Sequence, residues 1–135
     1  THCISSAASD VYKRQFLGAT LRPGVEIVME ALGLDAILSD ADLVITGEGR
    51  IDGQTVHGKA PIGVARVARR HGRPVIGIAG SLGHDAAKVH AHGIDAVFSV
   101  VNRPCTLEEA LAEAATNVRV TARNVAATSA IFRAR

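Results

Sequence analysis

Three charged side chains follow a short apolar run near the middle of the chain. Glu48, Arg50 and Asp52 come directly after the apolar residues 43–45. In open α/β sheets, the loops at the carboxyl ends of the strands hold the ligand. A guanidinium binds carboxylates and phosphates in a bidentate fork, and Mg²⁺ prefers carboxylate oxygens. The spacing therefore predicts a site for an anionic substrate and a metal-bound phosphate.

Small residues surround these charges. Gly47 and Gly49 flank Glu48, and Thr46 precedes them. Glycine permits a positive φ and a close approach of the backbone to a ligand. We expect the amides of this stretch to form a concave anion-binding nest, with the Thr46 hydroxyl as a further hydrogen-bonding group.

Two further positions extend the predicted site. Lys59 lies at the predicted start of a helix, where free amides and the helix dipole favour anions. The segment is not a Walker A motif, since Ala60 follows Lys59 in place of Ser or Thr. Gly80 and Ser81 follow a second apolar run. They indicate either a turn that needs a positive φ or a second contact to a phosphate or nucleotide.

The elements that position these loops alternate along the chain. The pattern predicts strands at 42–46, 74–79 and 96–101, and helices at 23–33, 60–71, 84–92 and 106–131, with an extra turn at 35–38. Strands that alternate with helices imply right-handed crossovers and a parallel sheet flanked by helices, a three-layer α/β fold. Three strands leave both edges of the sheet bare, so we expect further strands to complete it.

Local signals predict where individual helices begin and end. Thr106 and Glu109 form a capping box, and His84 or Asp85 opens the third helix. Glycines end the first three helices, at positions 33, 72 and 93. The first helix carries an apolar stripe made of Val25, Ile27, Val28 and Leu32.

Composition excludes several classes of function. Of the 135 residues, 47% are hydrophobic and only 3% aromatic, which predicts an aliphatic core. A formal charge of +2, with no aromatic residues between basic ones, argues against partners that are nucleic acids or membrane surfaces. Cys3 and Cys105 lie far apart and form no metal motif, so we expect a reduced, cytoplasmic protein. Residues 1–15 are predicted to be a non-native or disordered segment, and residues 16–135 the α/β portion.

The string from Ile45 to Thr55, followed by His57-Gly-Lys-Ala-Pro61, closely resembles the bacterial ATP-dependent glycerate kinases. The resemblance continues through residues 16–19, 21–24, 63–65, 74–76, 79–80, 93–99 and 107–110. It implies that the chain corresponds to the C-terminal portion of a longer kinase, with two α/β domains and the active site between them.

The resemblance also implies a reaction, in which ATP and glycerate give phosphoglycerate and ADP with Mg²⁺ as the metal. Phosphoryl transfer depends on positioning and on neutralisation of charge. We therefore expect Arg50 and Lys59 to contact the substrate carboxylate or the phosphate. Glu48 or Asp52 would bind Mg²⁺ or accept the hydroxyl proton, and the sequence does not distinguish the two. The positions expected to bind the nucleotide are Thr46, Gly47, Gly49, Gly80 and Ser81.

Two other interpretations stay open at the level of sequence. One is a non-catalytic α/β module that binds a nucleotide or a small anion, since Arg50 and Lys59 suit that role equally well. The other is an inactive fragment that is stabilised by self-association, for example as a homodimer.

Overall fold

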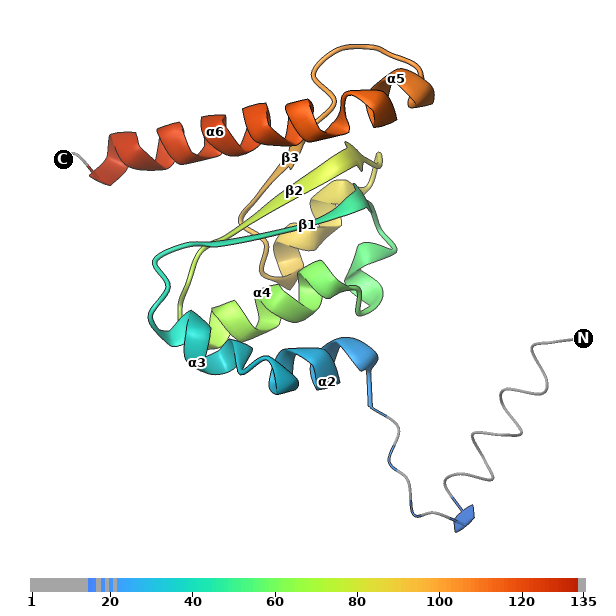
Figure 1. Ribbon diagram of the computed structural model, residues 1–135. Helices are drawn as coiled ribbons and strands as arrows, with labels where there is room; N and C mark the ends of the chain where they lie inside the picture. Colours follow the sequence, from blue (N-terminus) through green and yellow to red (C-terminus); the bar gives the residue numbers. More distant parts are fainter. Residues whose placement is uncertain (1–14, 17, 19, 21, 134–135) are drawn as a thin grey trace, which may run out of the picture.

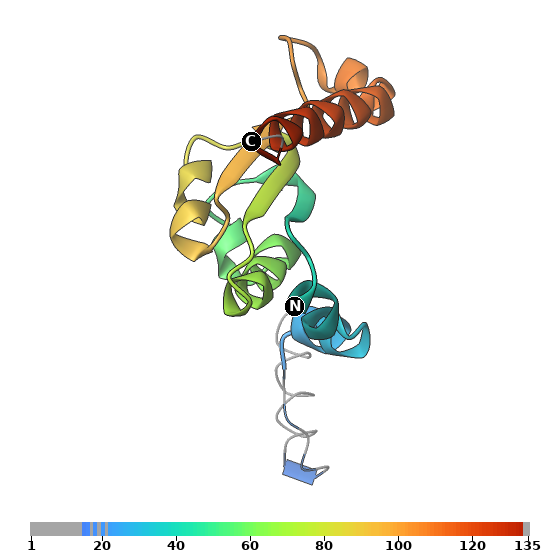
Figure 2. The ribbon, with the colours of Figure 1, turned by 90° about the vertical axis from the view of Figure 1, so that its left-hand side faces the viewer.

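The computed structural model describes residues 15, 16, 18, 20 and 22–133, without the side chains of residues 132 and 133. Its elements form layers around a small sheet (Figure 1). Helix α4 (Ala60–Arg70) and the 3₁₀ segment η2 (Ala86–His92) cover one face, and α6 (Ala114–Arg133) covers the other, as the view in Figure 2 also shows. The predicted three-layer α/β architecture is confirmed. The predicted N-terminal segment 1–15 lies, except for Gln15, outside the described residues.

The sheet contains three parallel strands in the order in which they occur along the chain. They are β1 (Val44–Ile51), β2 (Val75–Leu82) and β3 (Ala96–Ser99). Within the part of the chain that the structure describes, β1 and β3 are therefore edge strands. The first two strands run several residues further than the sequence predicts, and this changes the conformation of the candidate loops.

The remaining helical segments are α2 (Gly24–Ala31), α3 (Leu34–Ser39), η1 (Thr55–His57) and α5 (Leu107–Ala112). Helices α2 and α3 pack against α4 on the side away from the sheet. The predicted helix stops are confirmed, because glycines 33, 72 and 93 have φ values of 62°, 64° and 99°. The capping box of Thr106 and Glu109 is present in full.

Two helix predictions are wrong in detail. The segment predicted as one helix over 106–131 is divided at Glu113 into α5 and α6. The segment predicted as a helix over 84–92 is a turn followed by 3₁₀ helix over Ala86–His92, and Asp85 makes no side-chain cap there. The Asp85 carboxylate instead accepts a hydrogen bond from the distant Gly53 amide, so it is not available to cap its own helix.

The core is aliphatic, as the composition predicts. Its largest fully buried apolar side chains are Ile51, Ile62, Val75, Val89 and Ile94. No aromatic side chain belongs to the buried set among the described residues. No helix in that part of the chain combines the length and the apolar character that a membrane crossing requires.

The apolar stripe predicted on the first helix is mostly exposed. Ile27, Val28 and Leu32 are 50%, 56% and 67% exposed. Helix α2 approaches α4 through Val25 and Met29, which lie over Gly63. Most of the predicted stripe is therefore open to solvent.

Candidate functional site

The loops after β1 and β2 meet at the carboxyl edge of the sheet. The Gly83 amide donates to the Ile51 carbonyl at 2.8 Å, and the Gly53 amide donates to Asp85 Oδ1 at the same distance. Parallel strands send their carboxyl ends in one direction, so this meeting of loops follows from the topology.

Glu48 lies in the second half of β1, and its side chain reaches Lys59 at the start of α4. Its Oε1 accepts a hydrogen bond from the Thr55 hydroxyl, and its Oε2 lies 3.9 Å from Lys59 Nζ. The Glu48 side chain is only 18% exposed, whereas that of Lys59 is 45% exposed. The carboxylate is therefore fixed on one side and faces a cation that can reach solvent.

Arg50 and Asp52 form a second pair. Arg50 Nε lies 3.2 Å from Asp52 Oδ2, and Asp52 Oδ1 accepts a hydrogen bond from the Gln54 amide at 2.9 Å. The Arg50 side chain is 63% exposed, so a ligand can approach it from solvent.

Thr55 connects the two pairs. Its side chain is fully buried, and its hydroxyl accepts from the Asp52 amide at 3.1 Å while donating to Glu48. The structure thus brings the four predicted charged residues into two ion pairs, and the Thr55 hydroxyl joins the Glu48 carboxylate to the backbone of Asp52. Sequence reasoning missed Thr55, although it lies within the string of residues on which the family resemblance rests.

The glycines of the site differ from the prediction in conformation. Gly47, Gly49 and Gly80 lie within β1 and β2, and none of them has a positive φ. Extended residues do not form the predicted nest of successive amides, so that prediction is wrong.

Close strand packing explains two of these glycines. A Cβ at Gly47 would lie 2.2 Å from the Ile78 carbonyl oxygen, and one at Gly80 would lie 2.5 Å from the Gly49 oxygen. Thr46 is half-buried on β1, and Ser81 is exposed on β2 opposite Arg50. Of these two positions, only Ser81 lies near the carboxyl end of its strand, since Thr46 is the third residue of β1 and pairs with Gly77.

Two carboxylates at this edge are of the type that binds a hard divalent cation. Glu48 and Asp52 offer hard carboxylate oxygens, and Mg²⁺ in phosphotransfer sites takes one or two carboxylates together with substrate phosphates. Among the described residues, no group of three or more His, Cys, Asp or Glu side chains is placed to hold a metal ion. A phosphate would therefore have to supply part of the coordination.

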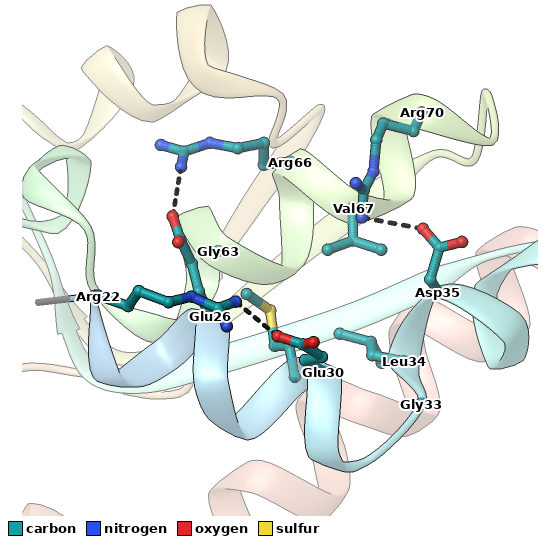
Figure 3. A pocket seen from close by; sticks show the side chains of 11 residues that line it. Arg22, Glu26, Glu30, Gly33, Leu34, Asp35, Gly63, Arg66, Val67 and Arg70 are labelled. Atoms are coloured by element: carbon teal, nitrogen blue, oxygen red, sulfur yellow. Dashed lines mark hydrogen bonds and ion pairs between the residues drawn. The ribbon is translucent and has the colours of Figure 1, made fainter. Parts of the chain in front are cut away.

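A hollow of about 460 Å³ between α2, α3 and α4 does not contain any of these residues (Figure 3). Three arginines on its wall are each paired with a carboxylate: Arg22 with Glu30, Arg66 with Glu26, and Arg70 with Asp35. Because these charges are balanced, the hollow lacks the excess positive charge that would favour an anion. The carboxyl edge of the sheet remains the candidate site.

Comparison with known proteins gives a consistent result. A family model described as the glycerate kinase family matches residues 13–130. Glycerate 2-kinase of Escherichia coli (strain K12) is 59% identical over 116 residues, which cover 86% of this chain and 30% of that protein. Glycerate kinase of Bacillus subtilis (strain 168) is 55% identical over 112 residues, or 83% and 29% of the two chains.

A solved structure agrees with these sequences. A crystal structure from Salmonella typhimurium LT2, described as a glycerate kinase 2, is 60% identical, with a TM-score of 0.68. The match covers 91% of this chain and 31% of that one. The chain therefore spans about 30% of the length of the curated relatives that it matches.

Proposed function

Since the chain belongs to the glycerate kinase family, we propose that it forms part of the active site of an ATP-dependent glycerate kinase. The reaction transfers the γ-phosphoryl group of ATP to a hydroxyl of glycerate and releases phosphoglycerate and ADP. The observation that supports this proposal is the pair of linked ion pairs, Glu48–Lys59 and Arg50–Asp52, at the carboxyl edge of the sheet.

The proposed mechanism assigns positioning and charge neutralisation to these side chains. Arg50 and Lys59 hold the glycerate carboxylate or the transferred phosphate. The substrate hydroxyl oxygen forms a bond to the γ-phosphorus while the bond to the β–γ bridging oxygen breaks. One of Glu48 and Asp52 accepts the hydroxyl proton, and the other would hold Mg²⁺.

The metal, when bound, neutralises charge on the phosphates. Contacts to the nucleotide come from β1 and β2, at Thr46, Gly47, Gly49, Gly80 and Ser81. An ATP-dependent kinase with a free Cys105 suits a reducing, cytoplasmic compartment.

A chimeric enzyme tests the proposal. The matching 116-residue segment of the E. coli relative is replaced by the corresponding segment of this chain. We expect release of ADP that depends on glycerate and Mg²⁺. A folded chimera that binds Mg²⁺-ATP in calorimetry without turnover would contradict the proposal and favour the non-catalytic binding module.

Substitutions of Arg50 and Asp52 test whether these two residues take part in the proposed reaction. Arg50→Ala and Asp52→Asn should each lower kcat/KM of the chimera about tenfold or more, because each removes a charge-stabilising contact. The control is Arg103→Ala, since Arg103 forms an exposed ion pair with Glu113, at 2.9 Å, outside the candidate site. Near wild-type rates for both site variants would refute their assignment.

The second candidate function, an inactive fragment that associates with itself, is favoured by one observation. Four large apolar side chains on or next to α2 and α3 are exposed, namely Ile27, Val28, Leu32 and Ile37. Light scattering on the 135-residue chain, with and without Ile27→Glu, shows whether the chain associates with itself through these side chains. A dimer that becomes a monomer in this variant and binds neither ATP nor glycerate would support the fragment hypothesis.

A further inference from the structure

Asp85 lies outside the predicted site but contacts its loop. It follows β2, yet its Oδ1 accepts a hydrogen bond from the amide of Gly53 at 2.8 Å. Gly53 is buried and comes directly after Asp52. The carboxylate therefore holds the peptide unit next to one of the proposed functional carboxylates.

The contact is tightly packed from both sides. A Cβ at Gly53 would lie 2.1 Å from Asp85 Oδ2, and a Cβ at Gly83 would lie 2.6 Å from the Asp52 Cβ. Each loop thus needs a glycine where the aspartate of the other loop approaches. The two loops interlock, and the Asp52 backbone has little freedom to move.

Charge strengthens this arrangement. Lys88 Nζ lies 3.2 Å from Asp85 Oδ2. The Gly53 amide, followed by the Lys88 ammonium, holds the pKa of Asp85 below its ordinary value. Asp85 is therefore an anion at neutral pH, and its bond to the amide is the stronger, charge-assisted kind.

We propose that Asp85 is a positioning residue of the phosphoryl-transfer site, which acts through the Gly53 amide to orient the Asp52 carboxylate toward Arg50. The inference rests on the proposed function. Residues that orient a functional carboxylate contribute to rate because small displacements of the reacting groups are costly.

Asp95 provides a matched control. Its Oδ2 accepts a hydrogen bond from the Val75 amide at 2.7 Å, the same kind of contact at the opposite end of β2. In the chimera, Asp85→Ala should lower kcat about ten- to hundredfold, the usual range for a residue that orients a functional ligand, with little change in the KM for ATP. Asp95→Ala should leave kcat within about twofold, since it acts only on stability.

Equal losses of kcat in the two variants would overturn the inference, because they would show that Asp85 acts only through stability. Circular dichroism checks that both variants fold. If Asp85→Ala does not fold, Asp85→Asn takes its place, since it removes the charge with little change in shape.

A double-variant cycle tests the route through Gly53. Gly53→Ala should impair turnover alone, because its Cβ would displace the Asp85 carboxylate. It should add little in the Asp85→Ala background, where that clash is absent. Additive losses would mean that the two residues act independently, which contradicts the inference.

A measurement on the 135-residue chain itself separates this inference from the proposed function. In NMR spectra, Asp85→Ala should shift the Gly53 amide proton upfield and move the Asp52 carboxyl carbon, whereas Asp95→Ala should move neither. If both signals stay in place in Asp85→Ala, the inference fails even when the chimera is active. If they move but the unsubstituted chimera transfers no phosphate, the proposed function fails and the coupling of Asp85 to Asp52 stands.

Discussion

At the scale of single residues, the Thr55 hydroxyl is a buried polar group that depends on two hydrogen-bonding partners. It accepts from the Asp52 amide and donates to the Glu48 carboxylate, and no part of the side chain reaches solvent. A buried group that loses its partner keeps the full cost of desolvation. Thr55 therefore stabilises the loop while it fixes Glu48.

Replacement of this hydroxyl by a methyl group should be costly. Thr55→Val keeps the shape but leaves the amide and the carboxylate without their shared partner, so we expect the free energy of unfolding to fall by about 1–3 kcal/mol. Urea denaturation measures the change. The control is Thr128→Val on α6, where an exposed hydroxyl donates to the Asn124 carbonyl and the loss should stay within about 0.5 kcal/mol. If both variants lost the same free energy of unfolding, the buried hydrogen bonds of Thr55 would not have the stabilising role proposed for them.

At the scale of elements, the start of α5 is held by a capping box between two residues that are close in the sequence. The Thr106 hydroxyl accepts from the Glu109 amide at 3.2 Å, and the Glu109 carboxylate accepts from the Thr106 amide at 2.8 Å. These two bonds satisfy amides that otherwise have no partner at a helix start. Both partners lie within one turn of each other, which explains why the sequence alone predicts the contact.

Loss of the cap should weaken the start of α5. Thr106→Ala is expected to lower the free energy of unfolding by about 1 kcal/mol, the typical value for an N-cap residue. Glu108→Gln, in the same first turn but outside the capping box, serves as the control in the same denaturation experiment. If Thr106→Ala were as stable as the original chain, the capping box would not contribute to folding.

At the scale of the whole molecule, stability depends on a few aliphatic side chains. Ile62 on α4 is 1% exposed, whereas Ile37 on α3 is 59% exposed. Ile62→Ala should destabilise the chain by about 2–5 kcal/mol, because it leaves a cavity in the core. Ile37→Ala should change stability by no more than about 0.5 kcal/mol. A similar loss at Ile37 would show that the outer face of α3 is covered in solution, as self-association would require.

The sequence by itself determined the features that depend on near neighbours in the chain. These include the alternation of strands and helices, the glycine stops at Gly33 and Gly93, and the capping box at Thr106. It also indicated that Glu48 and Lys59 belong to one site, since both lie in the segment that runs from β1 to the start of α4. The functional roles of these residues remain predictions.

Only the tertiary structure decided which distant groups meet. Gly47 is extended because it lies in β1 and pairs with β2, and the Ile78 carbonyl passes too close to it for a side chain. Asp85 reaches the Gly53 amide, 32 residues away, in place of capping its own helix. The physical reason is that such contacts depend on strand register and on competition between polar partners across the fold, which local propensities do not encode.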